Sequence, residues 1–395
     1  MLKTKIITLL AAILLFAGCS DAPSSVGVDD LGSDLLKVKV LNSETDSLTQ
    51  TSSTFRRISP LGAASFALFG NALGVRSDLL LQFIINFDEA TQNALKKDSI
   101  MLISARIVLT RAYAIGDTLQ SFPVSAVNGY RITSAWDPLK VKIDSLPNID
   151  FSADIFSSKP NPDSLYYFGI KPEIALEWMK NSVDTVNFSN NGLMLRAGAP
   201  TPFLIGFQGW SADGSNAPRL ELNFKFLSSN KDTTVSFRTL SDAHVIDGGK
   251  PALNPDEMMI QSGTAIESRL YFDLSKLPEN VFINNAELII VADTTKQMIG
   301  NKDLNGISVG IFDELTNDST FVKTSLYSAN LYYSNGKYSG NLTTLVRQLY
   351  TKKKNFGFLL TTSNPTEGLE TIYLKNSNAG SAIRPRLIIT YTKMD

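Results

Sequence analysis

The side chain with the most recognisable chemistry in this sequence is its single thiol, Cys19. The chain opens with the basic Met1–Lys5, continues through an apolar stretch over residues 6–16, and reaches two small residues just before the cysteine. This order is the pattern of a secretory signal, and the apolar stretch is shorter than the ~20 residues of a membrane-spanning helix. We therefore expect residues 1–18 to be removed as a signal peptide and Cys19 to carry a diacylglyceryl lipid.

The residues around Cys19 also indicate where the mature chain is anchored. Leu, Val or Ile usually stands three residues before a lipidated cysteine, and here Phe16 takes that place with Leu15 behind it. Residues 19–36 read as a short flexible tether. Asp21 in this tether resembles the export motif of surface lipoproteins in some Gram-negative bacteria, which favours an outer membrane lipoprotein that faces the cell surface. The alternatives are an inward-facing lipoprotein and an ordinary cleaved signal with an incidental cysteine.

Few other side chains in the sequence could serve in catalysis. There is one histidine, His244, and no CxxC, HExxH, GxSxG or Gly-rich phosphate loop. His244 lies in residues 241–249, where a strand end enters a loop, so we expect a solvated or structurally hydrogen-bonded imidazole. Glycoside hydrolysis needs two carboxyl groups about 5 to 9.5 Å apart, and nothing singles out such a pair. We expect a protein that is not an enzyme, with glycan cleavage as an alternative.

Composition excludes further classes of protein. The net charge is -1, and removal of residues 1–18 takes away two lysines, so no basic excess is available to bind the phosphates of nucleic acid. With Cys19 lipidated, no disulfide can form. The fold must therefore hold by packing, which a hydrophobic content of 43% allows. No apolar run after the signal is long enough to span a membrane.

The chain contains two copies of one pattern, which predicts two related structural modules. Four landmarks recur in the same order and at similar spacing: an apolar run, a second apolar run with a central alanine, a Gly-initiated strand, and a closing strand that contains Pro-Arg-Leu. The paired landmarks are residues 79–83 with 268–272, 102–109 with 283–290, 192–195 with 357–360, and 217–222 with 384–389.

Both copies consist mainly of short strands. Residues 220–226 alternate apolar and polar side chains, as half-buried strands do, and so do residues 234–238, which we place at the opening of the second copy. Two short amphipathic helices are expected at residues 172–180 and 342–350. Repeated short strands with few helices predict an all-β chain of two β-sandwiches, one at 37–228 and one at 229–395.

One run in the second copy resembles a known family. Ser268–Pro278 is similar to the R-S-L-L-K-F-D-L-S-x-L-P core of the DNRLRE-type jelly-roll domains, a family of carbohydrate-binding modules. Residues 283–290 resemble the strand that follows this core, and residues 127–136 resemble its Trp-containing strand and turn. The resemblance covers both copies over residues 40–395, although residues 82–86 replace the K-F-D-L motif in the first copy. It implies tandem jelly-roll-like sandwiches that bind extracellular carbohydrate.

Sugar binding requires aromatic rings that stack on pyranose faces, with polar groups beside them. The candidate ligand-binding rings are Trp210, in a Gly-containing loop, and Tyr332, Tyr333 and Tyr338, around a predicted hairpin turn. Tyr332 and Tyr333 point to opposite faces of an extended strand, so we expect at least one of them in the core. For Trp210, a loop anchor packed under the sandwich is the alternative.

Two other tryptophans, Trp136 and Trp178, match family positions that pack in the core, and we expect them there. The resemblance also implies a structural calcium ion, for which Asp29-Asp30 and Asp313-Glu314 offer oxygen ligands. Neither pair has the spacing of a defined calcium loop, so solvated side chains are the preferred interpretation, and we expect no other cofactor. The partner is expected to be an extracellular glycan, and the alternative is a structural or adhesive envelope component that binds other proteins.

Overall fold

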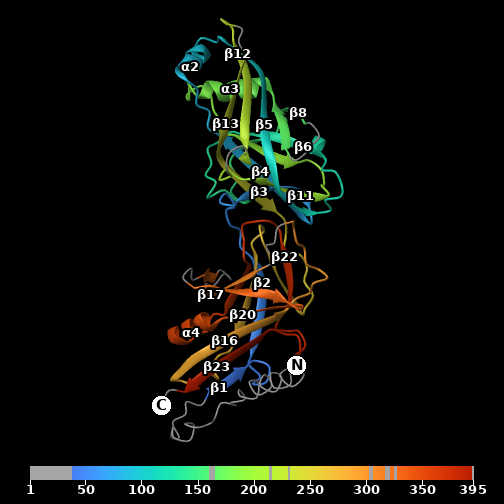
Figure 1. The fold of residues 1–395 in the computed structure, drawn as a ribbon, viewed down its shortest axis with the longest axis vertical. Helices are drawn as coiled ribbons and strands as arrows, with labels where there is room; N and C mark the ends of the chain where they lie inside the picture. Colours follow the sequence, from blue (N-terminus) through green and yellow to red (C-terminus); the bar gives the residue numbers. More distant parts are fainter. Residues whose placement is uncertain are drawn as a thin grey trace, which may run out of the picture.

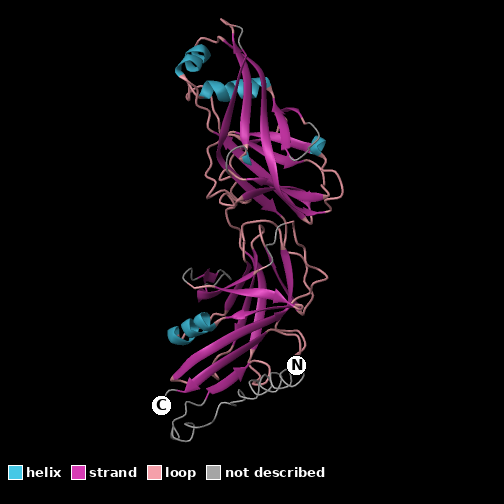
Figure 2. Ribbon diagram, viewed as in Figure 1, coloured by secondary structure: helices cyan, strands magenta, loops and turns pink. Residues whose placement is uncertain are grey.

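The computed structural model describes residues 38–159, 165–212, 216–229, 232–301, 306–315, 321–323 and 327–393. The predicted signal peptide, the tether, Cys19 and the Asp29-Asp30 pair lie outside the described residues. Figure 1 shows two bodies stacked end to end along the long axis, and Figure 2 shows that strands dominate both. No helix of the described residues is long and apolar enough to cross a membrane.

The prediction of an all-β, β-sandwich fold is confirmed, because the strands form two large curled antiparallel sheets. The upper body in Figure 1, the first sandwich, contains the following elements: β3 (Phe66–Ala72), β4 (Val75–Phe83), α2 (Glu89–Lys96), β5 (Ile100–Gly116), a 3-10 turn (Val124–Ala126), β6 (Val127–Ile132), β7 (Ile149–Asp150), β8 (Phe156–Ser158), β9 (Leu165–Ile170), α3 (Pro172–Asn181), β10 (Leu193–Ala197), β11 (Phe203–Gln208), β12 (Arg219–Phe226) and β13 (Asp232–Asp247).

The lower body in Figure 1, the second sandwich, is built from both ends of the described chain. Its elements are β1 (Val38–Asn42), β2 (Gln50–Arg56), β14 (Glu257–Gln261), β15 (Ile266–Phe272), β16 (Val281–Val291), β17 (Ile307–Leu315), β18 (Phe321–Lys323), β19 (Ala329–Ser334), β20 (Lys337–Asn341), α4 (Thr343–Lys352), β21 (Phe358–Thr362), β22 (Thr371–Lys375) and β23 (Arg386–Lys393).

The two sandwiches pair their repeated strands in the same register. Leu193 of β10 lies opposite Leu81 of β4, and Phe358 of β21 lies opposite Leu270 of β15. The closing strands agree in the same way, because β12 and β23 pair with the alanine-containing runs of β5 and β16 in equivalent positions. The repeat seen in the sequence therefore corresponds to a repeat of strand pairing.

The strand pairing departs from the predicted boundary between residues 228 and 229 at both ends. β1 and β2 precede the first sandwich in sequence, yet they pair with β23 and β15 of the second. β13, which we expected to open the second copy, pairs with β12 and β4 of the first. The expected opening strand of each copy thus completes the other sandwich. Alternating sequences specify which face of a strand is buried, but they do not specify which sheet edge the strand joins.

Each sandwich has its own apolar core. That of the first includes Trp178 of α3, which is fully buried as expected. Trp136 lies in a smaller cluster on the outer side of this sandwich, where it is partly buried and its indole N–H donates to the Asn191 carbonyl at 2.9 Å. The core of the second sandwich includes Leu41 and Leu48 from the N-terminal segment. The observed helices α3 and α4 agree with the two predicted helices within two residues.

A third apolar cluster joins the two sandwiches end to end. It brings Tyr113 of β5 together with Leu369 of the second sandwich. The Tyr113 hydroxyl donates to the buried Glu370 carboxylate at 2.7 Å. Gly300 permits this approach, because a Cβ at that position would lie 2.3 Å from the tyrosine ring. Asn301 adds two hydrogen bonds to the backbone of Ala114. The junction is therefore packed and hydrogen-bonded, unlike a flexible linker.

Candidate functional site

A groove of about 560 Å³ opens beside the C-terminal end of α4 in the second sandwich, and we call it the α4 groove. One wall is the end of β15 with the connection to β16, and the other is the end of α4 with the residues that follow it. The lining residues are Tyr271, Asp273, Leu274, Ser275, Glu279, Asn280, Leu349, Tyr350, Thr351, Lys353 and Asn355.

The first wall follows from the alternation of the run 271–278. Phe272 is buried in the core, so its neighbours Tyr271 and Asp273 point the other way and are partly exposed. The Asp273 carboxylate accepts the backbone N–H of Ser275 at 2.9 Å, which closes the turn that ends β15. Leu277 then returns to the core. The outward side chains of this run line the groove.

The second wall is set by the end of the helix. Lys353 adopts a left-handed conformation with φ of 51° and ends α4. The Asn355 side chain then donates to the Phe272 carbonyl at 2.8 Å, which ties this wall to β15. The Tyr350 hydroxyl accepts the N–H of Val281 and donates to the Pro278 carbonyl, each at 3.1 Å. These bonds fix the Tyr350 ring at the groove.

The lining of the α4 groove combines two tyrosine rings with short polar side chains. The Arg269 guanidinium lies 5.3 Å from the centre of the Tyr271 ring, a cation–π contact that holds the ring in place. Lys353 and Glu279 form an exposed ion pair of 3.7 Å at the rim. Apolar and aromatic surface with a few convergent polar groups is the usual composition of a small-molecule site. Rings and amide or carboxylate oxygens together suit a ligand with C–H faces and hydroxyl edges.

The equivalent place in the first sandwich is built differently. Gln82 takes the register position of Tyr271, and its side-chain amide donates to the Asn190 carbonyl at 2.8 Å. The connection from β4 to β5 contains α2, which begins where the Asp88 side chain accepts the N–H of Thr91 at 2.8 Å. Leu95 of α2 is buried. Beyond the helix, Asp98 forms an ion pair of 2.6 Å with Lys180 of α3. The helix α2 was not predicted from the sequence.

The four predicted rings do not form one site. Tyr338 is 1% exposed and belongs to the core, whereas Tyr332 is 69% and Tyr333 48% exposed. The expectation that Tyr332 or Tyr333 is a core residue is therefore wrong, because Leu331 and Tyr338 occupy the core positions of this hairpin. Tyr332 lines a second groove, of about 370 Å³, with Asn330, Asn341 and the first half of α4. Tyr333 packs beside Tyr338, with ring centres 5.3 Å apart.

Trp210 belongs to the first sandwich, in the loop that follows β11. Its ring is 51% exposed, so it is not packed under the sandwich as a buried anchor. Its backbone N–H donates to the buried Asp242 carboxylate at 3.0 Å. Burial raises the pKa of Asp242 to about 6, because the charged form loses hydration, and the hydrogen bond from Trp210 only partly offsets this.

His244 lies inside β13 and is 1% exposed, so the expectation of a solvated or hydrogen-bonded imidazole is wrong. Neither ring nitrogen has a hydrogen-bond partner among the described residues. Burial lowers the pKa of His244 to about 3, so the ring is neutral at physiological pH. The histidine of a Ser–His–Asp triad needs a hydroxyl within reach and an orienting acceptor, and His244 has no such hydrogen-bond partner among the residues that the structure describes.

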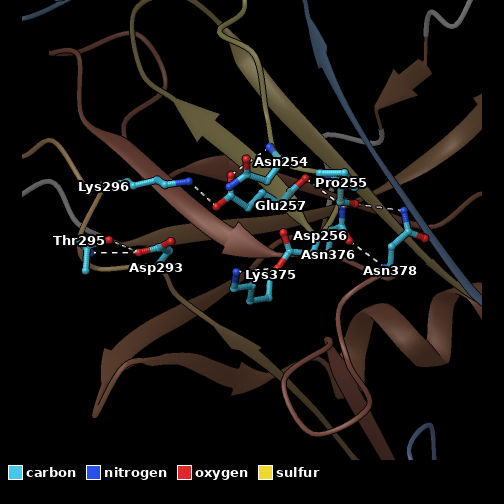
Figure 3. Close-up of polar contacts among 10 residues, drawn as sticks. All are labelled: Asn254, Pro255, Asp256, Glu257, Asp293, Thr295, Lys296, Lys375, Asn376 and Asn378. Atoms are coloured by element: carbon cyan, nitrogen blue, oxygen red, sulfur yellow. Dashed lines mark hydrogen bonds and ion pairs between the residues drawn. The ribbon is translucent and has the colours of Figure 1, made fainter.

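A cluster of polar contacts in the second sandwich lies around β14 and β22 (Figure 3). Asp256 pairs with Lys375 at 2.8 Å and Glu257 with Lys296 at 2.5 Å. Asn376 donates its side-chain amide to two backbone carbonyls there. The Lys375 hydrogen bond lowers the pKa of Asp256, and the Lys296 and Asn254 bonds outweigh burial to lower that of Glu257. These carboxylates are neutralised by lysines, as expected of a structural network.

The described residues contain no group of three or more His, Cys, Asp or Glu side chains that could hold a metal ion. Of the predicted calcium ligands, Asp313 instead forms an ion pair with Lys352 of α4, with 2.8 Å between its carboxylate oxygen and the lysine nitrogen.

The α4 groove was not assigned from the sequence, although the alternation of residues 271–274 marks its first wall. The second wall could not be found in this way, because it comes from a helix end that the fold brings across from about 75 residues further along the chain. Comparison of the sequence with protein-family models and with curated proteins gives no match.

Proposed function

We propose that this chain is a non-catalytic, lipid-anchored surface protein that binds extracellular carbohydrate in the α4 groove of the second sandwich. The observation that carries the proposal is the lining of the groove, where Tyr271 and Tyr350 stand beside Asp273, Asn280 and Asn355. Cys19 would carry the lipid, and the outer membrane, facing outward, is the proposed location.

The chemistry of a sugar ring fits this lining. A pyranose has C–H faces that pack on aromatic rings and hydroxyl edges that donate to carboxylate and amide oxygens. The Tyr350 hydroxyl is already hydrogen-bonded to two backbone groups, so its ring serves as a packing surface. Asp273 also keeps acceptor capacity, since a carboxylate has about four lone-pair sites and the Ser275 N–H uses one. A neutral or hydroxyl-rich glycan therefore suits the site better than a phosphorylated ligand.

A glycan array probed with the mature protein tests the proposal. We expect binding to a restricted set of glycans. Tyr271→Ala should raise the dissociation constant for the best of them at least about tenfold, or ~1.4 kcal/mol. Gln82→Ala, at the same register position in the first sandwich, is the matched control and should leave binding unchanged. Binding to no glycan would overturn the proposal. Loss on Trp210→Ala or Tyr332→Ala, with Tyr271→Ala unaffected, would move the site to those rings.

A second candidate function is that of an envelope component that binds another protein. The edge strand β1 favours it, because Val38 and Val40 are 61% and 56% exposed and Phe282 lies in the same cross-strand row as Val38. Among the described strands, β1 is paired on one side only. An exposed apolar edge accepts an added strand from a partner. A pull-down from envelope extracts should recover a stoichiometric protein that Val38→Lys with Val40→Lys no longer retains. Recovery of none would exclude this candidate.

A further inference from the structure

The second sandwich lacks two strands in the part of the chain that follows the first sandwich. Residues 249–393 contribute β14 to β23; β1 adds to the edge of β23, and β2 adds to β15, which meets β14 only at Ile266. β1 pairs with β23 over Val38–Asn42, and β2 pairs with β15 over Gln50–Arg56. The N-terminal segment thus bridges two edges of the second sandwich, while its covalent connection, the loop at residues 57–65, leads to β3 of the first sandwich.

The contacts of this segment are those of a fitted ligand. Leu41 and Leu48 are buried in the core of the second sandwich. Polar side chains match along β2, where Thr54 hydrogen-bonds Ser268 at 2.8 Å. At the first edge, the Glu44 carboxylate accepts Arg386 at 2.7 Å. Main-chain pairing thus comes with side-chain pockets and a charge pair, as when an extended peptide adds to a sheet edge.

Strand β13 completes two edges of the first sandwich in the same way. Its first half pairs with β12, its second half pairs with β4, and the register shifts between Thr239 and Ser241 where the strand turns from one edge to the other. With the two copies aligned on their closing strands, Val235 takes the place of Leu41. The opening segments of the two copies are therefore exchanged reciprocally within one chain.

We propose that the edges of β15 and β23 form an acceptor site for an extended strand, and that residues 38–56 occupy it as a ligand that stays bound when loop 57–65 is cut. The side chains of Leu41 and Leu48 give the site its specificity, and the main chain supplies much of its affinity. The partner is defined by this chemistry: a strand with apolar residues at these two places and small hydroxyl residues along its second half. With the proposed lipid on Cys19, a chain cut in loop 57–65 would keep both sandwiches at the membrane through this acceptor site.

The test uses the full chain with a specific protease recognition sequence, flanked by glycines and serines, inserted between Ser59 and Pro60. After complete cleavage we expect the N-terminal fragment to co-elute with the remainder in native gel filtration and to separate in concentrated guanidinium chloride. An excess of a labelled peptide of residues 38–56 should then exchange into the cleaved protein. The same peptide with Leu41→Asp and Leu48→Asp should not. Separation of the fragment under native conditions would overturn the proposal.

A pair of cysteine variants, made in a Cys19→Ser background, identifies the acceptor. Val40 lies opposite Thr390 in the observed pairing. If residues 38–56 completed the first sandwich instead, Val40 would face Asn223, the counterpart of Thr390 on β12. Val40→Cys with Thr390→Cys should keep the cleaved fragment attached in denaturant until a reductant is added. Val40→Cys with Asn223→Cys should not, and a crosslink there would contradict the assignment.

Discussion

The two sandwiches share a pattern of strand pairing and differ at one connection. In the first, the segment from β4 to β5 is long, folds into α2 and packs beside α3. In the second, the segment from β15 to β16 is short, and the α4 groove lies open between it and α4. The repeated strands specify the two cores, whereas the length of a connection decides whether a site is open. This agrees with the general concentration of binding residues on loops held by a rigid scaffold.

The largest expected effect on stability comes from α3 of the first sandwich. Trp178→Ala removes a fully buried indole from the first core. It should lower the free energy of unfolding by about 3–5 kcal/mol, whereas Leu349→Ala on α4 of the open sandwich should cost about 2–5 kcal/mol. Chemical denaturation followed by circular dichroism measures both. An unchanged midpoint for Trp178→Ala would show that α3 does not support the first core.

Acid should affect the two sandwiches in opposite directions. The raised pKa of Asp242, about 6 in the folded state, means that the folded state takes up the proton first. Its contribution therefore stabilises the fold as pH falls from above 6 toward 4. Asp242→Asn should remove this dependence and raise stability at pH 8 by at most about 3 kcal/mol, since each pKa unit corresponds to ~1.4 kcal/mol. Unfolding curves of both proteins across pH 4 to 8 check it, and parallel profiles would refute it.

The α2 helix of the first sandwich depends on its N-cap. Asp88→Ala removes the acceptor of the Thr91 N–H and should cost about 1 kcal/mol. Hydrogen exchange of the α2 amides should rise more than that of the β4 amides. Asp88→Asn, which keeps an acceptor, serves as the control. Equal exchange in the alanine variant and the wild type would show that packing alone holds α2.

The smallest effect is expected in the lysine–carboxylate network of the second sandwich. The Glu257 side chain is buried while Lys296 is partly exposed, and the Asn254 N–H still donates to the carboxylate, so Lys296→Met should cost no more than about 1 kcal/mol at neutral pH. The pKa of Glu257 is lowered, so the stability it provides is lost as pH falls through its folded-state pKa. Removal of Lys296 should raise that pKa, so the loss of stability in acid should begin at a higher pH. An acid unfolding profile that does not move would contradict this role.

The sequence was sufficient to predict the fold class, the repeat and two of the three described helices. These predictions rest on period-two alternation, on ordered landmarks such as Gly192 and Gly357, and on the spacing of apolar residues in residues 342–350. Local chemistry of this kind appears directly in the sequence.

The pairing partner of each strand and the burial of individual side chains could not be predicted in the same way. β1 alternates equally well against either sandwich, and only the global fold decides that it joins β23. Tyr332, Tyr333 and Tyr338 look alike in sequence, and their places depend on which face of the hairpin the core covers. His244 looked like a residue at a loop because two glycines follow it closely, whereas β13 runs on through it to Asp247.

The central claim, that the open groove of the second sandwich is a carbohydrate site, is tested most directly by an experimental structure of the mature protein with its best array glycan. We predict sugar density in the α4 groove, with a ring packed on Tyr271 or Tyr350 and a hydroxyl within hydrogen-bonding distance of Asp273. Density confined to Trp210 or to the Tyr332 groove, with the α4 groove empty, would contradict the claim.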